Sequence, residues 1–284
     1  MIEFVRAVAD HTFLQHALLA GVLAGVACGV IGSYVVVRRI TVIAGSIAHC
    51  VLGGMGAARY LQRVHGWTHA EPLYGAVVAA LAAAAVIGLV SLRAKQREDM
   101  VIGAVWAIGM AVGVLFISRT PGYSDDLMSY LFGDILLVSR RELWMMGALD
   151  LVIVAVGLLF FNQFLAVCFD EEFARLRGLN VELYYLLLLG LTALTVVLLV
   201  SVVGIVLVIA LLSLPVAIAG HFARTLAQLM VLSALCSMLV TTGGLALSYG
   251  PNLPAGATSI VLAGAAYLII LLGRRLLRPA TGRV

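Results

Sequence analysis

Long apolar stretches alternate with short polar connections along the whole chain. The stretches are rich in Leu, Val, Ala and Gly and lack the two-residue alternation of membrane β-strands. A helix of about 20 residues covers the roughly 30 Å hydrocarbon core of a bilayer. The pattern therefore predicts an all-α, polytopic integral membrane protein with about eight to nine transmembrane helices. The predicted segments are residues 13–37, 42–62, 73–92, 101–118, 143–167, 183–200, 204–220, 226–248 and 258–273.

Two connections leave the number of spans open. Ser201–Gly204 is only a faint break, so residues 183–220 can form one long bent helix or two, and Pro215 should kink or end the second. In the long connection after residue 118, Leu127–Val138 is apolar but too short to cross a bilayer, which favours an interfacial or re-entrant helix.

Basic residues predict the orientation, because Lys and Arg are enriched in cytoplasmic loops. Alternate connections hold twelve of the eighteen basic residues. With nine spans, this side is cytoplasmic, the N-terminus lies outside and the C-terminus inside. With eight spans the basic C-terminus would fall on the wrong side, so we expect nine. The twelve residues are Arg38, Arg39, Arg93, Lys95, Arg97, Arg175, Arg177, Arg224, Arg274, Arg275, Arg278 and Arg283.

Composition supports a single membrane domain over residues 1–284. The chain is 63% hydrophobic and 11% charged, whereas soluble domains carry about 25% charged residues. The first apolar run is too long for a signal-peptide core and is expected to be a retained span. The whole chain has a net charge of +4, and its arginines lie at helix ends, so no nucleic-acid surface is indicated.

His49 lies near the middle of the second apolar segment. Ser46, His49, Gly53 and Gly56 follow the three-and-four spacing of one helix face, and small residues on such a face allow a neighbouring helix to approach. An ionisable group at this depth is a candidate for a substrate path. The alternative is that His49 only hydrogen-bonds a neighbouring helix, and the helix by itself favours neither.

The connection 169–181 has the pattern of a short capped helix on the cytoplasmic side. Acidic residues begin it, arginines lie in its last turn and a glycine closes it. It shows apolar side chains to solvent, which favours a docking element for a soluble partner over an ordinary connector. The predicted docking residues are Asp170, Glu171, Glu172, Phe173, Ala174, Leu176 and Gly178.

Catalytic motifs are missing from the chain. Its only lysine, Lys95, is in a loop without the glycine pattern of a Walker A phosphate cradle, and neither H-E-x-x-H nor G-x-S-x-G occurs. An enzyme is therefore not expected. A secondary transporter or channel is the alternative class, but it would need coupling groups, usually acidic, inside the spans.

Two further histidines lie in the outer connection that follows the second segment. His65 and His69 are four residues apart and precede Glu71, so they can face one way and bind a metal outside. Because they lie in a loop, the favoured interpretation is that they are ordinary solvated residues.

Seven pieces of the chain, in this order, resemble the permease subunit of zinc/manganese-type ABC importers. The resemblance runs nearly from end to end. The pieces are GVACGVIGSYVVVRR at 25–39, SIAHCVLGGMG at 46–56, EDMVIGAVWAIGMAVGVLFIS at 98–118, YLFGDILLVS at 130–139, DEEFARLRGLNV at 170–181, LLSLPVAIA at 211–219 and LSYGPNLPAGAT at 247–258.

The resemblance implies a type II-like ABC importer permease in a bacterial or archaeal cytoplasmic (inner) membrane. Such a permease pairs with a second copy or a related sibling, sits among membrane lipids and rests on cytoplasmic ATP-binding subunits, which use the ATP. An extracytoplasmic metal-binding protein delivers a divalent transition metal, zinc, manganese or iron. No permanently bound cofactor is implied, and residues 169–181 resemble the coupling helix that docks on the ATPase.

The chain departs from this family at two positions. Many members have an Asp four residues before the intramembrane His, where this chain has Gly45. Many also have an Asp in the loop where this chain has Asn252. His49, Ser46 and Asn252 are then the candidates for the metal path, and the loss of carboxylates predicts weak binding along it.

Overall fold

The computed structural model describes residues 2–67, 69–93, 98–121, 133, 135–251 and 253–277. All regular secondary structure in these residues is helical, as the sequence predicts. The elements are α1 (Ile2–Asp10), α2 (Thr12–Val37), α3 (Thr41–Val64), α4 (Pro72–Arg93), α5 (Glu98–Arg119), η1 (Ile135–Leu137), α7 (Arg140–Leu159), α8 (Phe161–Phe169), α9 (Glu171–Leu176), α10 (Val181–Val203), α11 (Ile205–Ala219), α12 (Leu226–Tyr249) and α13 (Ala255–Leu277).

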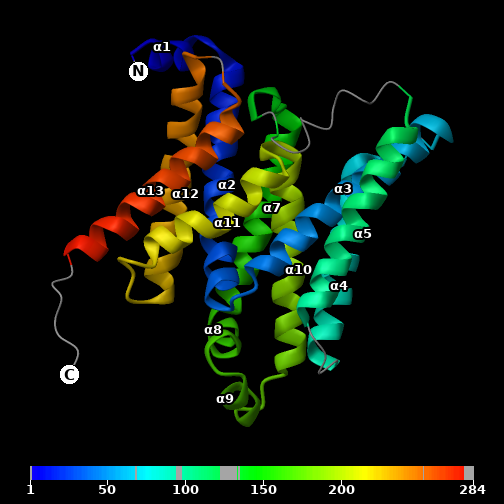
Figure 1. Cartoon of the computed structure of the whole chain (residues 1–284), viewed down its shortest axis with the longest axis vertical. Helices are drawn as coiled ribbons and strands as arrows, with labels where there is room; N and C mark the ends of the chain where they lie inside the picture. The colour runs from blue at the N-terminus through cyan, green and yellow to red at the C-terminus, as the bar shows by residue number, and fades with distance from the viewer. Residues whose placement is uncertain are drawn as a thin grey trace.

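Eight described helices are long and apolar enough to cross a membrane, namely α2, α3, α4, α5, α7, α10, α12 and α13. The ninth predicted span is α11, which has 15 residues and is about 22 Å long by helical rise. Although α11 is short, the chain turns back before and after it, so α10, α11 and α12 alternate in direction (Figure 1). The chain therefore reverses direction at α11 as nine spans predict, although only eight of the described helices are long enough to cross a membrane.

Gly204 makes the turn between α10 and α11. Its φ of +79° lies in the left-handed region that favours glycine, and it separates two helices where the sequence shows only a faint break. Gly133 packs directly against the backbone of Val203 at this corner. Pro215 is buried within α11 and does not end the helix, which continues to Ala219.

Three helices form the buried centre of the fold, and others cover it. Most residues of α2, α3 and α10 are buried, whereas α5, α7 and α13 are largely exposed, as expected of helices that face lipid or a partner. In Figure 1 α3, α4 and α5 lie together on the right and α2, α11, α12 and α13 on the left, with α7 and α10 between them. Tyr34 of α2 ties its helix to α7 by donating a hydrogen bond to the carbonyl of Gly157, at 2.9 Å.

Glycines bring α3 into close contact with α5. A Cβ placed on Gly53 would lie 2.7 Å from the carbonyl oxygen of Gly109, and one on Gly56 would lie 3.0 Å from that of Gly113. Neither backbone can approach the other this closely if a side chain intervenes. The two helices are therefore packed backbone to backbone, as small residues permit in membrane helices.

The contact of α3 with α4 is closer still. A Cβ on Gly54 would overlap the carbonyl oxygen of Gly75, and a Cβ on Gly75 would overlap that of Gly54. Because both glycines are required at one crossing point, α3 and α4 have little freedom to slide past each other. We call α3, α4 and α5 the α3–α5 unit, a group of three tightly packed helices.

The predicted helix at Leu127–Val138 is only partly within the described residues. Its end forms the single 3₁₀ turn η1, and Ile135 and Val138 are buried in the core, where η1 packs on α2. The remainder of that prediction lies outside the described residues.

The crossing of α3 and α4 yields a first prediction. Gly54→Ala should destabilise the protein by about 1–3 kcal/mol, because the added methyl overlaps backbone that has no rotamer with which to move away. Thermal unfolding of the purified protein in detergent measures this loss. The matched control is Gly103→Ala on α5, since a Cβ there meets nothing within 4 Å. Equal melting temperatures for the two variants would contradict the packing described here.

Candidate metal path and docking surface

His49 lies in α3 and faces α5. Its ring stacks on the indole of Trp106 with 4.5 Å between centroids and 17° between planes. The residue is half-buried, and its Nδ1 is buried without a hydrogen-bond partner among the described residues. Burying an imidazole nitrogen without a hydrogen-bond partner costs free energy, which makes His49 a candidate for a functional role. The predicted alternative was a hydrogen bond from His49 to a neighbouring helix, and Nδ1 makes none in the described part of the chain.

Trp106 is a site residue that the sequence analysis missed. It comes from a stretch of α5 that is otherwise Gly, Ala and aliphatic, so its register against His49 depends on how α3 and α5 cross. The same indole faces Gly45, where an added Cβ would lie 4.0 Å from Trp106 and 3.7 Å from Ile209. These are ordinary contact distances, so the position of Gly45 has room for a small side chain.

Two other glycines of the predicted face do not open space beside His49. Gly53 and Gly56 lie against the α5 backbone. Their small size serves close helix packing, as the spacing predicts, and leaves no room for an open path on that side. The imidazole is instead covered on one face by the Trp106 indole, which also lies near Gly45.

Of the other two residues predicted on the metal path, Ser46 lies within the described residues and Asn252 does not. Ser46 is fully buried and its hydroxyl donates to the carbonyl of Ile102, at 3.0 Å. That bond links α3 to α5. The contact gives Ser46 a role in helix packing, and its role as a metal ligand stays a prediction. Asn252 lies outside the described residues.

The predicted outer cluster does not assemble. No three His, Cys, Asp or Glu side chains within the described ranges come close enough to hold a metal ion. His65, at the end of α3, meets the edge of the Tyr60 ring at 5.6 Å, while Glu71 lies 3.9 Å from Arg141 of α7. The described residues therefore do not bring His65, His69 and Glu71 together as a three-ligand group, and His65 and Glu71 contact different neighbours.

Asp150 is a second ionisable group deep within a span. It is 4% exposed, and both carboxylate oxygens are buried without a hydrogen-bond partner among the described residues. It shares the buried face of α7 with Met146, Ile153 and Gly157. Asp150 was not singled out from the sequence, although it lies well inside the predicted segment 143–167, which was the available signal.

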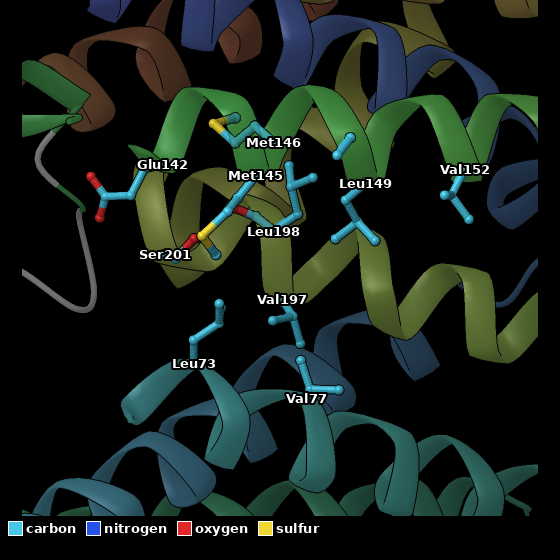
Figure 2. A pocket seen from close by; sticks show the side chains of 11 residues that line it. Leu73, Val77, Glu142, Met145, Met146, Leu149, Val152, Val197, Leu198 and Ser201 are labelled. Carbon is cyan, nitrogen blue, oxygen red and sulfur yellow. The ribbon is translucent and has the colours of Figure 1, made fainter. Parts of the chain in front are cut away.

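A cavity of about 370 Å³ between α4, α7 and α10 lies apart from His49 (Figure 2). Its walls are aliphatic and methionine side chains such as Leu73, Met145 and Val197. Glu142 at its rim belongs to the capping box that begins α7, with its carboxylate accepting from the Ser139 backbone at 2.7 Å. Such a lining suits apolar groups and offers no chemistry for a cation.

The segment after α8 forms the predicted capped helix, α9. The Asp170 carboxylate accepts from the backbone N–H of Phe173 at 2.9 Å, as an N-cap does. At the other end Gly178 has a φ of +77°, and the N–H of Leu179 donates to the carbonyl of Ala174. This is a Schellman closure, which requires the left-handed glycine. The predicted helix and both of its caps are confirmed.

The side chains of α9 divide into an outer and an inner set. Phe173 and Leu176 are 50% and 88% exposed, although both are apolar. Ala174 is fully buried against Val167 and Val181, so the structure corrects its predicted place on the docking surface. Glu172 is exposed, whereas the Glu171 carboxylate turns inward and pairs with Arg38 of α2.

Known proteins show the same fold. The solved structure of PsaBC from Streptococcus pneumoniae in complex with Fab matches with a TM-score of 0.84 and 30% identity, over 95% of each chain. The manganese transport system membrane protein MntC of Listeria monocytogenes is 34% identical and covers 95% of this chain and 93% of its own length. The fold and these similarities define the class as a multi-pass ABC importer permease, a transport subunit rather than an enzyme.

The family follows from a match over most of the chain. Residues 10–274 match the ABC 3 transport family. An uncharacterized membrane protein of Synechocystis is 44% identical over 275 residues, covering 97% of this chain and 95% of that protein. The chain belongs to the ABC 3 transport family.

Asp150 gives a second prediction. Asp150→Asn should raise the melting temperature, because it replaces a buried carboxylate with a neutral group of nearly the same size. Thermal unfolding in detergent tests this, and Asp99→Asn, at an exposed position in the first turn of α5, is the matched control and should change little. A lower melting temperature for Asp150→Asn would show that the carboxylate itself stabilises the fold.

Proposed function

We propose that this chain imports a divalent transition metal as the permease subunit of an ABC transporter. The observation that carries the proposal is the family match over residues 10–274. His49 inside a span and the exposed helix α9 supply a path and a docking point that fit this activity. The alternative of a secondary transporter or channel is not favoured, because members of an ABC family use ATP hydrolysis rather than a coupling ion.

Manganese is the first candidate for the cargo. The relative in Listeria monocytogenes is named as a manganese transport protein, and the Streptococcus gordonii relative, ScaB, as a manganese import permease. Zinc and iron are the other candidates, since an imidazole suits both. Without a carboxylate at Gly45, His49 offers one nitrogen ligand from this chain, which makes binding weak and release easy.

The path is proposed to run beside His49 and Trp106. A cation that leaves water needs replacement ligands, and the imidazole provides one while the indole face tolerates positive charge. A site with so few ligands does not trap its ion. Tight capture is then the task of an extracytoplasmic binding protein, and the permease provides passage.

The ATP-binding subunit is proposed to dock on α9. Phe173 and Leu176 form an apolar surface there, and Phe169, 69% exposed, extends it onto α8. Helices α8 and α9 lie at the lower end of Figure 1, toward which α2 also runs as it ends. That end is the cytoplasmic one in the proposed orientation, within the bacterial or archaeal inner membrane. A second permease copy completes the pathway.

Metal uptake by vesicles that contain the permease, its ATP-binding subunits and the binding protein gives the third prediction. Manganese should accumulate only with ATP. His49→Ala should lower uptake at least about tenfold, and His49→Gln should recover little, because an amide is a weaker ligand than imidazole. His221→Ala, in the α11–α12 connection, is the matched control. Uptake without ATP would refute the proposed function, and normal uptake by His49→Gln would make His49 a packing residue.

A fourth prediction concerns the docking surface. Phe173→Asp or Leu176→Asp should abolish ATP-driven uptake while the permease remains folded, because a charge buried in an apolar contact loses its hydration. Co-purification of the ATP-binding subunit measures the loss of docking directly. Phe222→Asp, at a 63% exposed residue near the α11–α12 connection, is the control. Normal co-purification of both α9 variants would show that the subunit docks elsewhere.

A further inference from the structure

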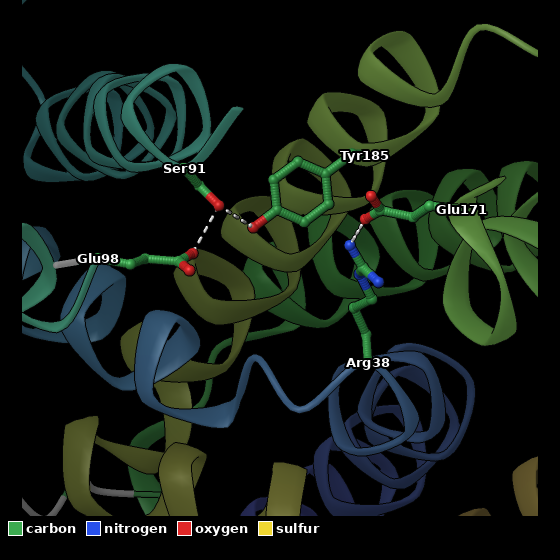
Figure 3. A network of polar contacts seen from close by, with 5 residues as sticks. All are labelled: Arg38, Ser91, Glu98, Glu171 and Tyr185. Carbon is green, nitrogen blue, oxygen red and sulfur yellow. Dashed lines mark hydrogen bonds and ion pairs between the residues drawn. The ribbon is translucent and has the colours of Figure 1, made fainter. Parts of the chain in front are cut away.

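Five polar and aromatic side chains join α9 to the α3–α5 unit (Figure 3). They come from α4, α5, α9 and α10 and from the residue that caps the end of α2. At one end Glu171 of α9 accepts a hydrogen bond from Arg38 at the end of α2. At the other end are Ser91 of α4 and Glu98 of α5, with Tyr185 of α10 between the two ends.

Arg38 makes two contacts at once. Its guanidinium pairs with Glu171 and also lies over the Tyr185 ring, 5.4 Å from the centroid. Both partners of the ion pair are largely shielded, with side chains 24% and 35% exposed. A planar guanidinium can pair with a carboxylate and stack on an aromatic face together, which an ammonium group does less well.

Tyr185 continues the chain of contacts toward α4 and α5. It is 3% exposed, and its hydroxyl lies 3.4 Å from that of Ser91. The Ser91 hydroxyl in turn donates to the Glu98 carboxylate at 2.6 Å. This bond fastens the end of α4 to the first turn of α5. The contacts thus run without a break from the docking helix to two helices of the α3–α5 unit.

The backbone next to Arg38 holds it in place. Arg39 has a φ of +62°, a left-handed conformation that non-glycine residues rarely adopt. The N–H groups of Arg39 and Ile40 donate to the carbonyls of Val36 and Val35, which closes α2 in a Schellman motif. Because the chain turns sharply there, Arg38 ends α2 at a fixed point beside α9 and α10.

We propose that Arg38 is a positioning residue that transmits a displacement of α9 to the α3–α5 unit. This proposal rests on the proposed function, in which α9 carries the ATP-binding subunit and α3 carries the metal path. Since glycine contacts bind α3 to α4 and α5, a shift of α4 and α5 also moves His49 and Trp106. In this proposal Glu171 pairs with Arg38 within the permease and does not contact the ATP-binding subunit.

The test uses the complete complex in phospholipid vesicles, with manganese as the transported ion. The measured quantity is the number of ions taken up per ATP hydrolysed. Arg38→Lys keeps the charge but loses the combined pairing and stacking, and it should lower this ratio about fivefold or more. Tyr185→Phe keeps the ring and removes the hydroxyl near Ser91, and it should lower the ratio in the same direction.

Two controls separate transmission from stability. Arg39→Lys makes the same substitution at the adjacent exposed arginine and should leave the ratio unchanged. Exchanging the charges, with Arg38→Glu and Glu171→Arg together, should recover part of the ratio lost in Arg38→Glu alone. Melting temperature and co-purification of the ATP-binding subunit should stay near wild type in Arg38→Lys and Tyr185→Phe.

Distinct results would overturn the proposal. A wild-type ratio in Arg38→Lys or in Tyr185→Phe would show that the contacts do not transmit the displacement. A lower melting temperature with an unchanged ratio would assign Arg38 a structural role only. If the wild-type complex takes up no manganese, zinc or iron, the proposed function itself fails, and the ratio is then undefined for every variant.

Discussion

The backbone contact of α3 with α4 and α5 is the constraint on which the rest of the structure depends. Gly54 and Gly75 meet at one crossing, and Gly53 meets Gly109 at another. In a membrane, helices gain little from hiding apolar surface, so close packing of small residues must hold them together. The crossing with α5 sets the register of α3, and that register places His49 on Trp106. The site follows from packing that involves neither site residue directly.

Polar groups within the spans differ in whether they find a hydrogen-bond partner. Hydroxyls such as those of Ser33, Thr192 and Thr195 donate to a carbonyl one turn earlier in their own helix. This satisfies them at little cost and explains their presence in apolar helices. Nδ1 of His49 and the carboxylate of Asp150 have no such partner in the described residues. Groups that are costly to bury and are not satisfied within their own helix are the ones to examine for function.

The sequence predicts spans and helix caps, which depend on residues close together in the chain. It does not predict contacts between residues that are far apart in the chain. The spans and the capped helix at Asp170–Gly178 follow from hydropathy and from cap residues close in sequence, and the structure has them. The stacking of Trp106 on His49 joins residues 57 positions apart, and the Arg38–Glu171 pair joins residues 133 apart. Helical spacing on one element says nothing about which neighbour fills its grooves. The position of Gly53 in the sequence therefore predicts a close helix contact but not that the backbone of α5 makes it.

The central claim is that His49 binds the transported ion as it crosses the membrane. Pulsed electron paramagnetic resonance of manganese(II) tests it directly, because the nuclear spin of a coordinating nitrogen modulates the electron-spin signal. The measurement uses the permease with its ATP-binding subunits and without the binding protein, so that no other chain supplies an external capture site. The account predicts imidazole nitrogen modulation that is present in the wild type and absent in His49→Ala. Bound manganese without that modulation, or with modulation that persists in His49→Ala, would contradict it.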